Sequence, residues 1–220
     1  MARRLPPISL YRLLGYVFVK PTLTLLLRPR VEGPGRIPRR GGCILVSNHE
    51  SPIDPFVLGL ASHRSIRFLA KAELYRFWIV RVFLRAFGTV PIERGEADRN
   101  ALAAARDLVQ RGAVLALFPQ GTCQPYRHRP FKRGAARLAL ETGVPVVPVA
   151  LVDTEKVLPP KRFKPRARRV RIVIGEPIRV ERVGRGQALR DATAQLTEQL
   201  ELAVAELRRP YGEPAHVWLD

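Results

Sequence analysis

Short apolar runs alternate with longer amphipathic stretches along most of this 220-residue chain. Apolar runs of four to eight residues are typical of buried strands, and the stretches between them have the periodicity of helices. We predict strands at Cys43–Ser47, Gly88–Ile92, Ala113–Phe118, Val146–Leu151 and Val170–Gly175. We predict helices at Asp54–Leu60, Leu74–Phe87, Ala97–Arg111, Gly134–Thr142 and Leu189–Arg209. This order predicts an α/β fold: a single domain with a largely covered mixed sheet flanked by helices.

The N-terminal segment differs from the rest of the chain. Residues 1–30 are predicted to form an amphipathic helical arm in a membrane interface, and residues 31–220 to form the domain. The apolar segment Ile8–Leu27 is interrupted by Arg12 and Lys20, so neither part reaches the roughly 18 residues of a membrane-spanning helix. Basic residues around it favour contact with anionic headgroups. The alternative is an amphipathic helix that packs on the protein's own core.

Charge and cysteine content narrow the possible partners. The chain has 38 basic and 19 acidic side chains, a formal net charge of +19, which predicts an anionic partner. Nucleic acid is not favoured, because within the basic run Lys161–Arg171 only Phe163 could stack on a base. Cys43 and Cys123 cannot form a disulfide framework and lack the spacing of a zinc site. We therefore expect no bound metal and a reducing cytoplasm.

His49 and Asp54 lie on the loop between the first core strand and the first helix of the domain. Pro52 and Pro55 keep this loop out of a regular helix, in which residues five apart would diverge. The loop can therefore fold His49 back onto Asp54. An imidazole held by a carboxylate has a fixed tautomer and a free nitrogen that can accept a proton from a hydroxyl. The pair predicts a general base, although taken alone it could equally be a structural histidine at a strand end.

A serine nucleophile is not expected on this loop. Ser47 and Ser51 lie close to His49 in the sequence, but neither sits in the Gly-x-Ser-x-Gly turn that exposes a nucleophilic serine. The loop is therefore interpreted as carrying a base without a protein nucleophile.

Three further blocks follow along the chain. Gly88–Arg94 and Phe118–Thr122 each end a later strand, and the third block is Val144–Val149. Together with Asn48-His49 and Asp54, and in this order, they resemble the glycerolipid acyltransferase family, the 1-acylglycerol-3-phosphate O-acyltransferases of phospholipid synthesis. The resemblance runs from about Cys43 to Leu151. Its most specific parts are the His/Asp loop and the Phe-Pro-x-Gly-Thr turn. The segments Phe68–Leu74 and Phe131–Gly134 are also similar to family sequence.

The resemblance implies a reaction and a membrane-associated enzyme. His49 would deprotonate the sn-2 hydroxyl of lysophosphatidic acid, with Asp54 as its orienting partner, and the oxygen would attack the thioester of acyl-CoA or acyl carrier protein to give phosphatidic acid. The implied substrate-binding residues are Lys71, Arg94, Gln120, Gly121 and Thr122, of which the first two would hold the acceptor phosphate. No cofactor is implied beyond the acyl donor. The implied location is the cytoplasmic face of the cell membrane, as a peripheral protein.

The chain departs from the family pattern in two places. It has Gln120 where the family usually has Glu, and Cys123 where it usually has Arg. Arg127 or Arg129 could replace that arginine. The departures leave open a different acceptor, such as glycerol 3-phosphate or another lysolipid, and a noncatalytic basic protein that binds lipid or nucleic acid. The basic run Lys161–Arg171 is either a solvated face or a contact for coenzyme A phosphates, carrier protein or lipid headgroups.

Overall fold

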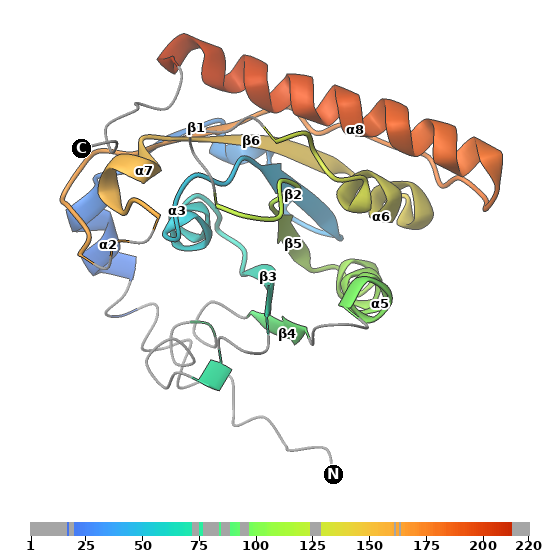
Figure 1. The fold of residues 1–220 in the computed structure, drawn as a ribbon, viewed down its shortest axis with the longest axis horizontal. Helices are drawn as coiled ribbons and strands as arrows, with labels where there is room; N and C mark the ends of the chain where they lie inside the picture. The colour runs from blue at the N-terminus through green and yellow to red at the C-terminus, as the bar shows by residue number, and fades with distance from the viewer. Residues whose placement is uncertain are drawn as a thin grey trace.

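A computed structural model of the chain describes residues 17, 20–71, 75–76, 84, 89–92, 97–123, 129–160, 162 and 164–212. Within these ranges the strands form one seven-stranded sheet in the order β1-β7-β6-β2-β5-β3-β4 (Figure 1). The strands are β1 (Arg30–Glu32), β2 (Cys43–Ser47), β3 (Ile66–Lys71), β4 (Val90–Ile92), β5 (Val114–Leu117), β6 (Val146–Val152) and β7 (Arg171–Ile174). All neighbours are parallel except β6 and β7, so the sheet is mixed, as predicted.

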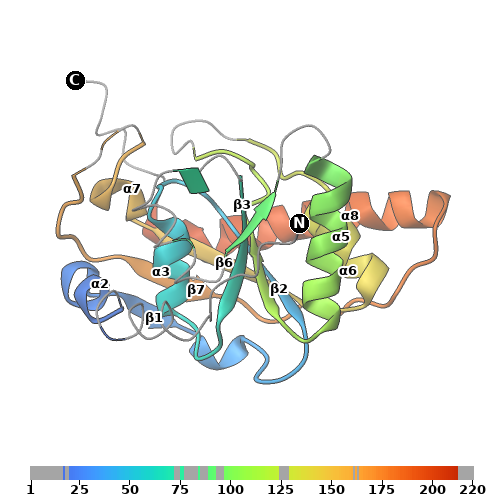
Figure 2. The same ribbon diagram turned by 90° about the horizontal axis from the view of Figure 1, so that it is seen from below.

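Helices cover both faces of the sheet (Figures 1 and 2). Within the described ranges they are α2 (Lys20–Leu27), α3 (Asp54–Leu60), α5 (Ala97–Gln110), α6 (Gly134–Thr142), α7 (Thr154–Val157) and α8 (Gln187–Arg208). Buried side chains of α2, α3 and α7 belong to one core cluster, and those of α5, α6 and α8 belong to the other. The predicted α/β sandwich with a covered sheet is confirmed.

The central strand β2 shows why the sequence folds this way. All five of its residues are buried. Cys43 and Leu45 contact the cluster of α2, α3 and α7, whereas Ile44 and Val46 contact the opposite cluster. Successive side chains of a strand point to opposite faces, so a strand covered on both faces is apolar throughout. The polar loop that follows β2 therefore lies at the end of the sheet where the parallel strands have their carboxyl ends.

Two strands of the sheet, β1 and β3, were not predicted. β1 has three residues and spans the predicted boundary between the arm, residues 1–30, and the domain. It forms because β7 offers a parallel partner, with Arg30 beside Arg171. β3 pairs with β5 on one side and β4 on the other. Such pairing depends on segments far away in the chain, so local periodicity does not reveal it.

The other predicted elements that fall on described residues are confirmed, with bounds that differ by at most two residues. Two predicted elements lie partly outside the described residues. Most of the predicted helix Leu74–Phe87 lies outside the described residues, and so does Gly88, the first residue of the strand now seen as β4. The short helix α7 was not predicted.

The described part of the N-terminal arm packs against the core. In α2, Leu27 is fully buried, and Leu23 and Leu26 are partly buried against the cluster that includes α3. This is the arrangement given above as the alternative to a membrane arm. Leu25 nevertheless remains 75% exposed. Within the described ranges, every helix is too short or too polar to cross a bilayer.

Candidate active site

The loop that leaves β2 brings His49 and Asp54 into contact. Nδ1 of His49 lies 2.8 Å from Oδ2 of Asp54. Asp54 is the first residue of α3, and its amide donates to the carbonyl of Ser51 over 3.1 Å, which closes the turn between them. The loop thus folds back as its two prolines predict.

The carboxylate of Asp54 is held by three donors. Besides His49, the backbone amides of Glu50 and Ser51 donate to the same Oδ2 atom, over 2.7 and 2.9 Å. A carboxylate only accepts hydrogen bonds, so Nδ1 of His49 is the donor and Nε2 is left as an acceptor. The Asp54 side chain is fully buried, whereas that of His49 is 19% exposed. The ring is therefore fixed from within and open to a reactant from outside.

The serines beside His49 serve the fold. Ser47 and Ser51 are fully buried. The hydroxyl of Ser51 donates to the carbonyl of Leu158 over 2.6 Å, and that of Ser47 donates to the carbonyl of Asn48 over 3.2 Å. This geometry agrees with the sequence argument against a serine nucleophile.

Two phenylalanines support the imidazole. The ring of His49 stacks on Phe118 with centroids 4.4 Å apart, and Phe118 stacks on Phe68 with centroids 6.4 Å apart. Phe118 follows β5 and Phe68 lies in β3, so the stack depends on the pairing of these two strands. Neither side chain was predicted to belong to the site, although both lie in segments that resemble the family.

Gln120 braces the His49 loop. Its Oε1 accepts a hydrogen bond of 2.7 Å from the backbone amide of His49. The two residues meet because β2 and β5 are adjacent and parallel, which places the loops after them side by side. A glutamate at this position could accept the same bond, so the change from the family's usual residue preserves this contact.

We expect Gln120→Leu to lower the free energy of unfolding by about 1 kcal/mol, because the partly buried His49 amide loses its acceptor. Gln120→Glu is the matched control and should stay within a few tenths of the original value, since it keeps an acceptor oxygen. Urea unfolding followed by circular dichroism measures both. Equal stability of the leucine and glutamate variants would show that the contact contributes nothing.

Gly121 is required by the turn that follows β5. Its φ angle is +78°, a region that favours glycine. A Cβ atom there would lie 2.9 Å from Nζ of Lys132, which comes from the loop before α6. The backbone amide of Lys132 donates to the carbonyl of Pro119 over 3.0 Å, which ties the two loops together. The glycine thus lets a basic side chain approach the turn beside His49.

Thr122 and Cys123 continue this turn. Thr122 is exposed. Burial raises the pKa of the Cys123 thiol, and the nearby negative charges of Asp54 and Glu50 raise it further. The thiol therefore stays protonated at neutral pH and is a poor nucleophile, although it lies close enough to the carboxylates to feel their charge.

The two residues expected to hold a phosphate are placed only in part. Lys71 is the last residue of β3, paired with Ile92 of β4, so its backbone lies at the sheet edge where β2 and β5 also end. Arg94 lies outside the described residues, as does Arg127. Arg129 belongs to the segment that leads back to α6 and is partly exposed.

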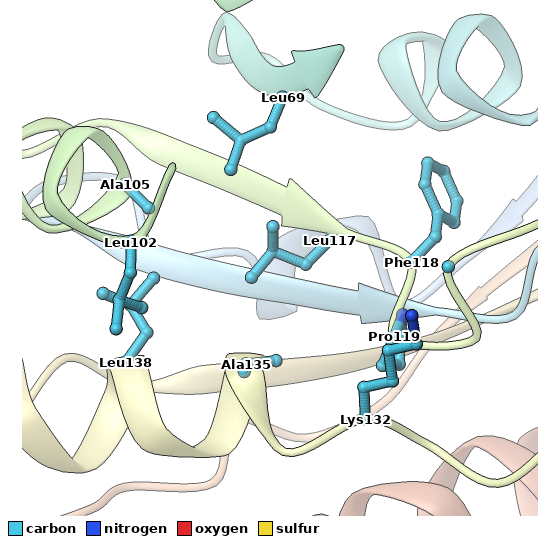
Figure 3. A pocket seen from close by; sticks show the side chains of 11 residues that line it. Leu69, Leu102, Ala105, Leu117, Phe118, Pro119, Lys132, Ala135 and Leu138 are labelled. Atoms are coloured by element: carbon cyan, nitrogen blue, oxygen red, sulfur yellow. The ribbon is translucent and has the colours of Figure 1, made fainter. Parts of the chain in front are cut away.

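An apolar cavity of about 210 Å³ lies beside the site, between β5, α5 and α6 (Figure 3). Leucines from four elements contribute to its wall: Leu69, Leu102, Leu117 and Leu138. Phe118, whose ring stacks on the imidazole of His49, forms part of the wall. Lys132 and Gly121 line the end nearest the loops. The cavity is suited to a hydrocarbon chain whose reactive end lies near His49.

Buried charges lie behind the loop. Glu50 is only 5% exposed and contacts Arg208, the last residue of α8, over 2.8 Å. Burial raises the pKa of Glu50 to about 8, although the charge of Arg208 lowers it. Glu155 of α7 is fully buried, and burial raises its pKa too. Within the described residues, no group of three or more His, Cys, Asp or Glu side chains is arranged to hold a metal ion.

The raised pKa of Glu50 predicts a pH-dependent stability. Between its ordinary pKa of 4.5 and about 8, the folded protein binds more protons than the unfolded chain. The free energy of unfolding should therefore fall as pH rises through this window, by up to a few kcal/mol.

Glu50→Gln mimics the protonated side chain and provides the comparison. We expect it to match the parent protein near pH 5 and to exceed it in stability near pH 8. Denaturant titrations at several pH values measure the difference. A constant difference between the two proteins over that range would contradict the assignment of the titration to Glu50.

The chain is similar in sequence to known acyltransferases. A family model described as Acyltransferase matches residues 28–152. The chain is 36% identical over 120 residues to the chloroplastic 1-acyl-sn-glycerol-3-phosphate acyltransferase BAT2 of Brassica napus, covering 53% of this chain and 35% of that protein. It is 25% identical over 190 residues to the 1-acyl-sn-glycerol-3-phosphate acyltransferase of Bacillus subtilis, covering 86% of this chain and 92% of that one.

A solved structure extends the likeness to the fold. The crystal structure of the 1-acyl-sn-glycerophosphate acyltransferase PlsC from Thermotoga maritima superimposes with a TM-score of 0.71 at 25% sequence identity, over 94% of this chain and 81% of that one. The chain spans only about a third of the length of two chloroplastic relatives, 35% of the Brassica napus protein and 37% of LPAT1 of Arabidopsis thaliana. Because the family model covers more than half of the sequence and includes the whole His/Asp loop, the chain belongs to the acyltransferase family, as its motifs predicted.

Proposed function

We propose that this protein is an O-acyltransferase that moves an acyl chain from a thioester to the sn-2 hydroxyl of lysophosphatidic acid, giving phosphatidic acid. The observation that carries the proposal is the His49–Asp54 contact of 2.8 Å at the carboxyl edge of the sheet. The relatives named above are 1-acyl-sn-glycerol-3-phosphate acyltransferases, which supports this acceptor. The donor is a thioester of coenzyme A or of acyl carrier protein.

The proposed reaction needs one base and no covalent enzyme intermediate. Nε2 of His49 accepts the proton of the acceptor hydroxyl while the oxygen attacks the thioester carbonyl. Asp54 keeps the imidazole in the required tautomer and balances its positive charge. The tetrahedral intermediate then expels the thiolate, which takes up the proton from His49, so that an ester and a free thiol are formed. Cys123 takes no part as a nucleophile, because its raised pKa keeps it protonated.

The acyl chain of the donor and the phosphate of the acceptor each have a proposed binding place. The acyl chain occupies the cavity of about 210 Å³ beside Phe118. The acceptor phosphate lies near Lys132, which approaches the turn of Gln120 and Gly121. Lys71 and Arg94 are proposed as further phosphate ligands, and Thr122 as part of the acceptor site. A phosphate with two or more basic partners would be held with its hydroxyl toward His49.

One assay tests this function. The purified protein is offered one labelled donor, acyl-CoA or acyl carrier protein, with lysophosphatidic acid, glycerol 3-phosphate or another lysolipid. Labelled phosphatidic acid formed only with lysophosphatidic acid supports the proposal. Parallel reactions with labelled acyl-CoA and with labelled acyl-acyl carrier protein identify the thioester that the protein uses. Product formed only with another acceptor would show that the acceptor is not lysophosphatidic acid but that compound. No product with any acceptor would favour the noncatalytic basic lipid-binding protein.

We also propose that α2 contacts an anionic membrane, at the cytoplasmic face. Leu25 of α2 is 75% exposed. The basic run Lys161–Arg171 ends beside α2, because the amide of Val170 donates to the carbonyl of Leu27 over 3.1 Å. Within this run Lys164, Arg168 and Arg169 are exposed. An exposed leucine next to clustered cations suits the headgroup region of a bilayer.

Leu25→Glu should weaken binding to vesicles that contain anionic lipid by about tenfold or more. It removes an exposed leucine that would insert into the bilayer, and it adds a negative charge that the anionic lipid repels. Leu202→Glu is the matched control, since Leu202 is 58% exposed on α8. Vesicle sedimentation measures both. If the two variants bind alike, the membrane contact lies elsewhere on the protein.

A further inference from the structure

We propose that Arg208, the last residue of α8, is a positioning residue that holds the His49 loop in its active shape through Glu50. The inference rests on the proposed function, because it concerns the pair assigned there as the base. Arg208 and Glu50 are 158 residues apart in the sequence. Arg208 is 11% exposed at its side chain and Glu50 is 7% exposed, so their contact is largely removed from water and from salt screening.

Arg208 ties the loop to the neighbouring strand as well as to the helix. Its Nη1 donates to a carboxylate oxygen of Glu50 over 2.8 Å and to the carbonyl of Leu151 in β6 over 2.7 Å. Asn48 makes a parallel set of contacts. Its Nδ2 donates to Glu50 over 3.0 Å and to the same Leu151 carbonyl over 2.8 Å, and its Oδ1 accepts from the Leu151 amide over 2.8 Å.

These contacts fix the residues on both sides of His49. Asn48 precedes it and Glu50 follows it, and both side chains are held by β6 or α8. The backbone amide of Glu50 also donates to Oδ2 of Asp54 over 2.7 Å, the atom that accepts from His49. A rotation of the Glu50 backbone would therefore move a donor away from Asp54 and shift the carboxylate that orients the imidazole. Misplacement of a base by a fraction of a bond length lowers its rate of proton transfer.

The positive charge of Arg208 interacts with two buried carboxyl groups, which is a physical reason for an arginine at this position. It acts on both Glu50 and Glu155 and favours their ionised forms against burial. One guanidinium can neutralise only one of the two, so a proton on the other balances the cluster. An ionised or a protonated Glu50 can accept the hydrogen bond from Arg208, which makes the contact available on both sides of neutral pH.

The test compares Arg208→Met with Arg208→Lys and with the exposed neighbour Arg209→Met. Near pH 6, where Glu50 can stay protonated without its partner, we expect Arg208→Met to remain folded and to lose about 30- to 100-fold in kcat. KM for lysophosphatidic acid and for the thioester should change less than about threefold, because Arg208 touches neither substrate. The lysine variant should recover part of the rate, and Arg209→Met should keep the parent rate.

A double-mutant cycle establishes the route through Glu50. Glu50→Leu alone should lose as much kcat as Arg208→Met, and the double variant should be no slower than either single one. Glu50→Gln keeps the acceptor and should stay close to the parent rate. The double variant leaves only Glu155 without the charge of Arg208, one buried carboxyl fewer than Arg208→Met leaves, so it provides a folded sample if that single variant does not. A folded double variant with full activity, or losses that multiply between the single variants, would overturn the proposal.

A substrate-independent measurement separates this proposal from the proposed function. The Nδ1 proton of His49, hydrogen-bonded to Asp54, can be followed by NMR in the free protein. We expect its signal to be lost or shifted in Arg208→Met and unchanged in Arg209→Met. An unchanged signal in both variants contradicts the positioning role. If the parent protein transfers no acyl group but the signal responds to Arg208, the proposed function fails and the positioning role stands.

Discussion

His49→Ala is expected to lower kcat for acyl transfer to lysophosphatidic acid by about 10³-fold. The reason is that the acceptor hydroxyl loses the only base that the His49–Asp54 geometry provides for it. The fold should survive, because the change removes one hydrogen bond to Asp54 and one ring stack on Phe118. We expect a loss of about 1 to 2 kcal/mol in the free energy of unfolding. Release of free thiol from acyl-CoA measures the rate.

His63→Ala is the matched control, because His63 is an exposed histidine that lies between α3 and β3. It should leave kcat and stability unchanged. A His49→Ala variant that is folded and turns over within about tenfold of the parent rate would falsify the assignment of His49 as the base.

Asp54 is expected to affect both stability and rate, and two substitutions separate the effects. Asp54→Ala leaves the buried amides of Glu50 and Ser51 without their acceptor, at about 1 to 3 kcal/mol each. We expect it to lower the free energy of unfolding by about 2 to 5 kcal/mol and to abolish activity. Asp54→Asn keeps an acceptor oxygen but loses the charge. It should remain folded and lose about 10² to 10⁴ in kcat, because an amide cannot balance the imidazolium.

Urea unfolding and thiol release measure the two variants. Asp107→Asn, an exposed aspartate on α5, is the control and should match the parent protein in both. Unchanged stability in Asp54→Ala would contradict the three-donor arrangement at Oδ2. An Asp54→Asn variant with the parent kcat would mean that the carboxylate's charge is not needed for the reaction.

The part of the site that lies within one loop could be predicted from the sequence. His49 and Asp54 are five residues apart, and Pro52 and Pro55 restrict the chain between them, so their contact is a local property. The Phe-Pro-x-Gly-Thr turn was recognisable for a similar reason, because the conformation at Gly121 depends on its own residues. The family likewise followed from blocks read in order along the chain.

The contacts between loops could not be predicted. Gln120 was expected to line the acceptor site, whereas its Oε1 accepts from the His49 amide. That bond joins residues 71 positions apart and exists because β5 lies beside β2. Arg208 had no distinguishing signal in the sequence, since it is one of two consecutive arginines at the end of the predicted helix Leu189–Arg209. Only the crossing of α8 over the sheet decides that one is buried against Glu50 and the other is exposed (Figure 1).

By itself the sequence determined the α/β class, both faces of β2, the His/Asp loop and the family, because periodicity, proline and turn residues act within a few positions of the chain. Tertiary structure alone decided the strand order, the presence of β1 and β3, the partner of Gln120 and the burial of Arg208. Hydrogen bonds and ion pairs form between whichever groups the packed elements bring within about 3 Å, and that distance depends on the whole fold.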